Sequence, residues 1–289
     1  MNYYLFVLLL AGTAAFLWAA WIEPRLYQIN RYDVSLHKPL GRSYRVLHLT
    51  DIHFAKKDGK LGGFFDRLAK ESYDFVFVTG DVIDCEEGIT SCVENLKKFS
   101  PAFGTYVVFG NHDYFDYHLW DVISNSSPSN GRLKYKNRPD LFEKALEKEG
   151  IRVMRNETEE IKSGRDSLLI HGLDDPVTGR ANIRKAMQDF DPAKVNILLT
   201  HTVDVFLDIG EGEIDLSFSG HSHGGQICMP LLGPVVIHTV FGRHYAAGIR
   251  RLRGAVCSIS RGVGASRFFF LRFLAPPEAI VLNVHGTHH

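Results

Sequence analysis

Five short segments of the chain carry residue types that bind divalent metal ions. They are Asp51-Ile-His53, Gly80-Asp81, Gly110-Asn111-His112-Asp113, His201 and Gly220-His221-Ser222-His223. A single Asp or His after an apolar run is usually a turn or capping residue, but five such segments together are improbable on that basis. Carboxylate and imidazole ligands suit Mn, Fe or Zn, and these segments contain no cysteine for a structural zinc cluster. Oxygen and nitrogen ligands on loops indicate a catalytic metal centre.

The spacing within two of these segments predicts pairs of ligands that face the same way. Successive side chains of an extended segment alternate between its two sides, so residues two apart lie on one side. Asp51 and His53 are therefore expected to face one ion, and the same argument applies to His221 and His223.

The remaining segments complete a centre for two ions. Asp81 follows a glycine, and a carboxylate on a tight turn can offer both oxygens and so bridge two ions. Asn111 offers a neutral carbonyl oxygen where another carboxylate would repel a phosphate. With His201, the set reaches seven ligands and fits two ions about 3.5–4 Å apart. Because such a pair polarises a phosphoryl group and generates hydroxide near neutral pH, the sequence predicts hydrolysis of phosphate esters.

The apolar runs before the ligand segments predict the strands of an α/β fold. Strands are expected at 44–50, 75–79 and 105–109, with helices between them at 64–72 and 89–99. This alternation predicts a parallel sheet covered on both faces, with the functional residues at the carboxyl ends of its strands.

The second half of the chain predicts a further sheet. Residues 114–137 contain turn residues and are expected to form an inserted loop. Beyond it, the pattern predicts helices at 139–149 and 183–190 and strands at 151–155, 167–171, 195–200 and 214–219. Frequent glycines and short apolar runs from Gly224 onward are typical of antiparallel structure. Two sheets packed together are the simplest architecture.

The N-terminal segment reads as a membrane anchor. Residues 3–22 are apolar and uncharged over about the length that spans a bilayer, and Trp18 and Trp21 suit its interface. A cleaved signal peptide is the less favoured alternative, because no basic residue precedes the segment, and a buried helix is a third reading. Basic residues follow the segment, which favours a single-pass protein of the inner (cytoplasmic) membrane with its soluble domain in the cytoplasm. The predicted organisation is an anchor at 1–24, a connector at 25–42 and one domain at 43–289.

Composition excludes several classes of protein. Hydrophobic residues make up 45% and charged residues 23% of the 289-residue chain, so a disordered chain and a multi-span membrane protein are both excluded. Thirty-three basic residues balance thirty-three acidic ones, and we therefore expect no nucleic-acid partner. The four cysteines show no CxxC spacing, which favours a reducing compartment.

The metal-ligand segments, together with Gly80-Asp81-x-x-Asp84, resemble the calcineurin-like metallophosphoesterase family in full order from about residue 45 to 225. The resemblance implies an α/β fold, a four-layer α/β/β/α sandwich, here with an N-terminal transmembrane helix. It also implies two divalent ions, Mn, Fe or Zn with Mn favoured. The first ion would be held by Asp51, His53 and His223, and the second by Asn111, His201 and His221, with Asp81 bridging them.

The resemblance gives His112 and Asp84 the catalytic roles. His112 would contact the phosphate and help to protonate the leaving group, and Asp84 would orient it. A carboxylate fixes the tautomer of an imidazole and supports its charged form, so this pairing suits a general acid.

Three hypotheses for the function remain. Gly224-Gly225-Gln226, Arg261-Gly-Val-Gly264 and Pro277-Glu278 resemble a membrane-anchored subset of the family. The leading hypothesis is therefore a membrane-anchored hydrolase of a phosphodiester or pyrophosphate, with the bilayer and a lipid-linked nucleotide such as UDP-diacylglucosamine, from lipid A synthesis, as its partners. The alternatives are a phosphatase or phosphodiesterase of a soluble phosphoprotein or metabolite, and a scaffold without metal. The sequence leaves the oligomeric state open.

Two other segments bear on the substrate. Aromatic residues around 114–120 predict either a cover over the site or a local packing cluster. Residues 267–274 place apolar side chains between arginines, as an interfacial segment or a core strand does. Arg250, Arg251 and Arg253 form either a second phosphate site or a solvated turn.

Overall fold

Two six-stranded sheets form the body of the molecule. The computed structural model describes residues 3–55, 59–118, 120–121 and 136–287. In order across the first sheet, the strands are β1 (Gln28–Ser35), β14 (Glu278–His285), β2 (Tyr44–Leu49), β3 (Phe75–Thr79), β4 (Thr105–Val108) and β5 (Arg152–Val153). In order across the second, they are β12 (Gly248–Leu252), β13 (Ala255–Ile259), β9 (Leu216–Ser219), β8 (Val195–Leu199), β7 (Asp166–Gly172) and β6 (Glu157–Ser163).

Both sheets are mixed: the first has one antiparallel pair inside it, and the second has an antiparallel pair at each edge. β2, β3, β4 and β5 run parallel, whereas β14 is antiparallel to β2. In the second sheet β7, β8, β9 and β13 run parallel, and β6 and β12 are antiparallel to their neighbours. The sequence analysis missed β6, because its seven residues are mostly polar and half exposed.

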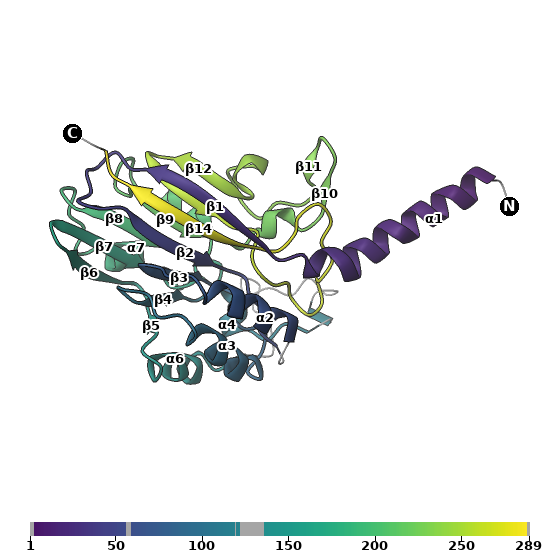
Figure 1. Ribbon diagram of the computed structural model, residues 1–289, viewed down its shortest axis with the longest axis horizontal. Helices are drawn as coiled ribbons and strands as arrows, with labels where there is room; N and C mark the ends of the chain where they lie inside the picture. Colours follow the sequence, from purple (N-terminus) through teal and green to yellow (C-terminus); the bar gives the residue numbers. More distant parts are fainter. Residues whose placement is uncertain (1–2, 56–58, 119, 122–135, 288–289) are drawn as a thin grey trace.

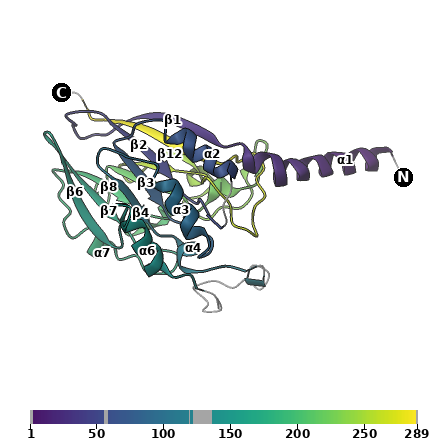
Figure 2. The same cartoon turned by 60° about the horizontal axis from the view of Figure 1, so that its bottom comes forward.

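Alternating side chains in each strand build the layers. In β3, Phe75 and Phe77 point into the core between the sheets, and Val76 and Val78 point into the core beneath the helices. Helices α2 (Gly59–Leu68), α3 (Gly88–Leu96) and α6 (Pro139–Glu147) cover the outer face of the first sheet (Figures 1 and 2). The short α7 (Ile183–Ala186) and the 3-10 turn Val203–Leu207 pack on the outer face of the second. The predicted four-layer α/β/β/α sandwich is confirmed.

The N-terminal segment forms a helix that projects from the sandwich (Figure 1). It comprises α1 (Tyr3–Leu17), a π turn (Trp18–Ile22) and a 3-10 turn (Glu23–Arg25). The whole helix, Tyr3–Arg25, is by length and composition apolar enough to cross a membrane. None of the fifteen residues of α1 is buried, so the reading as a buried helix of the domain is wrong.

The predicted connector at 25–42 contains an edge strand of the sandwich. β1 pairs in parallel with β14 over its whole length, from Gln28 against Glu278 to Ser35 against His285. This strand was not predicted, because it lies at an edge and only Val34 among its residues is buried, so its apolar pattern is weak. Its partner β14 comes from the other end of the chain.

Candidate metal centre

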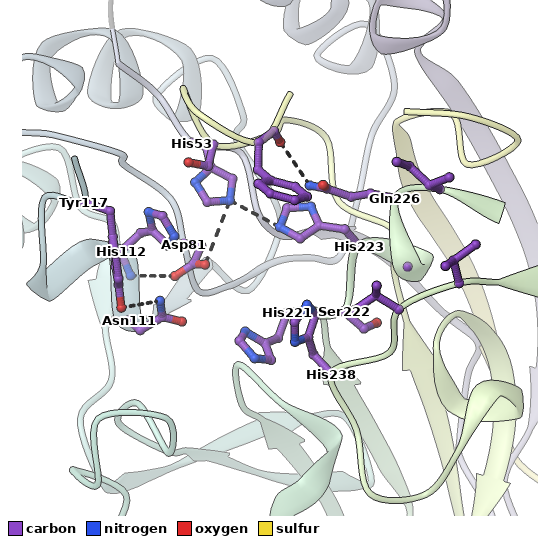
Figure 3. A pocket seen from close by; sticks show the side chains of 16 residues that line it. His53, Asp81, Asn111, His112, Tyr117, His221, Ser222, His223, Gln226 and His238 are labelled. Atoms are coloured by element: carbon purple, nitrogen blue, oxygen red, sulfur yellow. Dashed lines mark hydrogen bonds and ion pairs between the residues drawn. The ribbon is translucent and has the colours of Figure 1, made fainter. Parts of the chain in front are cut away.

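The predicted ligands meet at one end of the two sheets. They lie on the loops that follow β2, β3 and β4 of the first sheet and β8 and β9 of the second, because the carboxyl ends of these strands face the same cleft. Figure 3 shows the histidines and Asp81 pointing toward one another across this cleft.

The ligand atoms form two groups joined by Asp81. Asp51, His53 and His223 offer atoms that all lie within 4.8 Å of one another, and so do Asp81, His201 and His221. The Asp81 Oδ2 atom lies 3.3 Å from His201 Nε2 and 3.9 Å from His53 Nε2. Its carboxylate therefore stands between the two groups, where a bridging ligand would be required.

Left-handed backbone turns, rather than extended alternation, bring these ligands together. The φ angles are 48° at Asp51, 54° at His53, 68° at His221 and 47° at His223. Such conformations are unfavourable for residues with a side chain and persist where the surrounding structure enforces them. Asp51 and His53 do fall into one group, as the spacing predicted, although left-handed turns and not an extended backbone place them there. The prediction that His221 and His223 face one ion is wrong, because they fall into different groups.

Asn111 is placed to complete the second group. Its Nδ2 donates to the Tyr117 hydroxyl at 3.0 Å, while its Oδ1 is buried and has no hydrogen-bond partner among the described residues. An orphaned buried carbonyl oxygen is costly unless it has a ligand. The residues thus fit two divalent cations, with Asn111 Oδ1 as one of the oxygen ligands.

Burial and neighbouring charges shift the pKa values of the predicted ligands, and these shifts affect cation binding. Burial lowers the pKa of His221 to about 3 and, with help from His53, holds the pKa of His223 well below its usual value. Both rings are therefore neutral. Burial opposes the charged forms of Asp81 and His201, but their mutual attraction prevails, lowering the Asp81 pKa and raising that of His201. A cation binding between these two must displace a proton, so its affinity falls as the pH falls.

Asp84 links a ligand histidine to His112. Its Oδ1 lies 2.8 Å from His112 Nδ1 and 3.2 Å from His53 Nδ1. Burial lowers the pKa of His112, but the carboxylates of Asp81 and Asp84 outweigh it and raise that pKa above its ordinary value. The pairing of Asp84 with His112, predicted from the family resemblance, is present in the structure.

Arg267 holds the other oxygen of Asp84. Its backbone N–H and Nε donate to Asp84 Oδ2 at 3.1 and 2.8 Å, and its Nη2 contacts Asp116. The sequence analysis treated Arg267 only as the start of an interfacial segment or core strand. Because it lies 183 residues from Asp84, no local spacing could have revealed this contact.

Arg272 is a second residue that the sequence analysis did not place at the site. It is fully buried, and its Nη2 donates to the carbonyl oxygens of Arg261 and Gly264 and lies 3.4 Å from His223 Nδ1. Its backbone N–H donates to the Ala19 carbonyl at 3.0 Å. Residues 267–274 are thus neither a strand nor a free surface segment, but connect the metal centre to the end of the N-terminal helix.

Five of the seven predicted ligands line a cavity of about 460 Å³, namely His53, Asp81, Asn111, His221 and His223. One wall is apolar and consists of Ile227, Val235, Val236 and Phe269, and Gln226 at the same wall donates to the Phe269 carbonyl at 3.3 Å (Figure 3). The volume falls within the range of small-molecule sites. A ligand with a phosphate on the cations would therefore have an apolar surface beside it.

The other candidate segments have mainly structural roles. Tyr114 is buried in the core beneath the helices and its hydroxyl donates to Asp174, as a local packing cluster requires. Tyr117 reaches the cavity, whereas Leu119 and residues 122–135 of the predicted loop lie outside the described residues.

The guanidinium groups of Arg250 and Arg253 donate to carbonyl oxygens, and Arg251 contacts His37. None of these three arginines lines the cavity over the metal centre.

Comparison with known proteins agrees with this geometry. Residues 44–225 match the family model described as calcineurin-like phosphoesterase. The uncharacterized metallophosphoesterase YkoQ of Bacillus subtilis is 29% identical over 243 residues, which cover 77% of this chain and 83% of that protein. The UDP-2,3-diacylglucosamine pyrophosphatase LpxG of Chlamydia trachomatis is 24% identical, covering 96% of this chain and 94% of that protein. The phosphodiesterase YaeI of Escherichia coli is 23% identical, with coverage of 95% and 94%.

Proposed function

The chain belongs to the calcineurin-like phosphoesterase family and is a metal-dependent phosphoester hydrolase, and we propose that it cleaves a phosphodiester or pyrophosphate bond in a lipid-linked nucleotide. UDP-diacylglucosamine, an intermediate of lipid A synthesis, is the favoured substrate. The single observation that carries this proposal is the apolar wall of the cavity directly beside the ligands of the metal centre. A soluble phosphoprotein or a small metabolite would make little use of that wall.

A second cavity supports a lipid substrate. It has a volume of about 620 Å³ and extends from His53 to the end of the N-terminal helix at Trp21, with Tyr27 and Phe270 among its lining residues. An apolar chain attached to a phosphate at the metal centre could thus lie along a path that ends beside the membrane helix. An anchor joined to the domain at this point would hold the opening of the path next to the membrane.

The proposed ligands are Asp51, His53 and His223 for one ion and Asn111, His201 and His221 for the other, with Asp81 between them. Manganese is the favoured metal. Two divalent cations, when bound, polarise the phosphoryl group and make water nucleophilic near neutral pH.

The protein's own side chains orient the proton donor and supply the proton to the leaving group. The Nδ1 atom of His112 is engaged by Asp84, which leaves Nε2 to face the cavity. From there His112 donates a proton to the leaving oxygen, and Asp84 keeps the ring in the required tautomer and orientation. Because Arg267 fixes Asp84 in turn, the donor is held in place before substrate arrives.

The proposed setting is the inner membrane, with the helix as a single-pass anchor and the domain in the cytoplasm. The bilayer and a phosphorylated lipid are the proposed partners, and no nucleic acid is involved. The support for this orientation is that the basic residues Arg25, Arg31, Lys38 and Arg42 follow the apolar segment.

The proposal is tested with full-length protein purified in detergent and supplied with manganese. We expect turnover of UDP-diacylglucosamine in mixed micelles and of a soluble bis-aryl phosphodiester, with both lost in Asp81→Ala. The matched control is Asp116→Asn, which changes a half-buried aspartate outside the ligand groups. Turnover of the soluble diester but not of UDP-diacylglucosamine would refute the lipid substrate and leave the assignment as a phosphoester hydrolase intact. If the purified protein contains no metal and has neither activity, the hypothesis of a non-catalytic scaffold is supported.

A further inference from the structure

We propose that a hairpin beside the metal centre inserts into the surface of the same bilayer that the N-terminal helix crosses. The segment, here called the insertion hairpin, comprises residues 228–236 and contains the short strands β10 (Cys228–Met229) and β11 (Gly233–Pro234). The proposal concerns where the domain rests and does not depend on its substrate.

The insertion hairpin exposes an unusual number of large apolar side chains. Leu231 at its tip is fully exposed, Leu232 is 62% exposed, and Met229, Val235 and Val236 are each about half exposed. Phe269 and Phe270 on the neighbouring segment are also about half exposed. Single exposed apolar residues are common, but a contiguous group of this size usually marks a surface that another apolar phase covers.

Hydrogen bonds fix the insertion hairpin relative to the end of the membrane helix. The Cys228 N–H donates to the Phe273 carbonyl, and the Phe273 N–H donates to Gln226, each at 2.8 Å. The backbone N–H of Arg272, the residue before Phe273, donates to the Ala19 carbonyl in the helix at 3.0 Å. Figure 1 shows β10 and β11 on the side of the domain from which the helix projects.

The bilayer is the occupant that this position favours. The helix carries Trp18 and Trp21 near its end, and tryptophan concentrates at the membrane interface. The face of the domain beside Trp21 therefore lies at the level of the headgroups when the helix spans. An apolar tip held at that level meets lipid, and a basic rim completes the surface, because Arg25 bonds the Trp21 carbonyl and Arg243 the Leu232 carbonyl.

The insertion hairpin also forms part of the cavity over the metal centre. Val235 and Val236 line that cavity and continue into the exposed tip. If the tip enters the bilayer, the apolar wall of the cavity is continuous with the hydrocarbon phase. A substrate could then pass from the membrane to the cations without exposing its apolar part to water.

The test measures the environment of the tip in the full-length protein. A nitroxide label is attached at Leu231→Cys or Leu232→Cys in a Cys228→Ser background, because the other native cysteines, Cys85, Cys92 and Cys257, are buried. The protein is reconstituted in nanodiscs of phosphatidylethanolamine and phosphatidylglycerol. Collision rates of the label with molecular oxygen and with a water-soluble nickel chelate are then measured by electron paramagnetic resonance.

The matched control is Leu141→Cys, an exposed leucine on α6 far from the helix in both views of the ribbon. We expect oxygen collisions to exceed chelate collisions several-fold at positions 231 and 232, and the reverse at 141. Chelate access at 231 and 232 equal to that at 141 would overturn the proposal. Dipolar broadening between two labels at 231, unaffected by lipid, would also overturn it in favour of a contact between two copies. Unchanged thermal unfolding of each variant confirms that the label reports on the folded chain.

Discussion

At the scale of single residues, the structure concentrates several functions on Asp84. One of its oxygens accepts from two histidines, and the other accepts from Arg267. A carboxylate buried with that many donors is held in a single orientation, and it transmits that orientation to His112. The residue is therefore placed to orient both His53, a predicted ligand, and His112, the proposed proton donor.

Replacing Asp84 with asparagine should separate these roles from folding. An amide cannot support the charged imidazole, so we expect Asp84→Asn to lower kcat about 100-fold or more on a soluble diester at saturating manganese. Metal content measured by mass spectrometry should stay at two ions per chain under these conditions. Asp116→Asn serves as the control, since Asp116 also contacts Arg267. A kcat within threefold of the wild type would show that Asp84 does not act through His112.

Arg267 should act as a positioning residue. We expect Arg267→Gln to lower kcat about tenfold, because Asp84 Oδ2 loses the charged Nε donor and keeps only the backbone N–H of residue 267. We expect Arg267→Lys to recover part of that loss. Thermal unfolding measured alongside should change little in either variant, since the guanidinium is about one-third exposed. Equal losses in the two variants, or a large fall in stability, would indicate a structural role instead.

At the scale of elements, the turns after the strands decide where the ligands point. Gly220 directly follows β9 and precedes His221, and a Cβ atom built on it would overlap with Asp51 Oδ2 and Thr50 Oγ1. The backbone of the loop after β9 thus lies directly against the side chains of Thr50 and Asp51, which follow β2. The His221 N–H donates to Asp51 Oδ2 at 3.0 Å.

A methyl group at this turn should damage the site. We expect Gly220→Ala to weaken metal binding at least tenfold and to lower the free energy of unfolding by about 1–3 kcal/mol, because Asp51 must move. Calorimetric titration with manganese and thermal unfolding measure the two effects. Gly63→Ala is the control: it lies in α2 with nothing within 4 Å of a new Cβ, and should stabilise by about 0.5–1 kcal/mol. Metal affinity unchanged in Gly220→Ala would contradict the close approach.

The end of the N-terminal helix belongs to the folded domain. Ala19 and Ala20 are buried, the Ala19 carbonyl accepts from Arg272, and Glu23 accepts from Trp18 and from the Ala275 N–H. Removing residues 2–17 should therefore leave the stability of the domain nearly unchanged, whereas removing 2–22 should lower its Tm by several degrees. Thermal unfolding of the two truncated proteins in the same detergent measures the difference. Equal Tm values would show that the helix end contributes no stability.

At the scale of the whole molecule, the metal centre joins the two sheets. Asp51, His53, Asp81 and Asn111 come from the first sheet, and His201, His221 and His223 come from the second. Cations held between them bind the folded chain and not the unfolded one, so they stabilise it by mass action.

Removing the metal should therefore lower the Tm. If manganese is present at about 100 times its Kd, its stabilisation is about 2.7 kcal/mol, equivalent to roughly 5–10 °C for a domain of this size. We expect a chelator to lower the Tm by this amount and added manganese to restore it. Asp81→Ala provides the comparison, since its Tm should respond to neither treatment. A wild-type Tm that is indifferent to the chelator would contradict a centre that spans both sheets.

Much of this arrangement follows from the sequence by itself. Strand-like runs that end in ligand residues indicated both an α/β fold and a metal centre, because parallel strands bring their carboxyl ends to one edge. The apolar N-terminal segment indicated a membrane helix by length and composition alone. These inferences depend on local periodicity and on residue chemistry, which a linear sequence records directly.

The family resemblance implied how the ligands divide, but only the tertiary structure showed what enforces that division and what surrounds the ligands. The separation of His221 from His223 depends on left-handed turns that the packing of two sheets enforces, and alternation along an extended segment predicts the opposite. The contact of Arg267 with Asp84 and the pairing of β1 with β14 join residues from distant parts of the chain. Such contacts arise from the energy of the whole packed molecule, so no spacing within a short segment contains them.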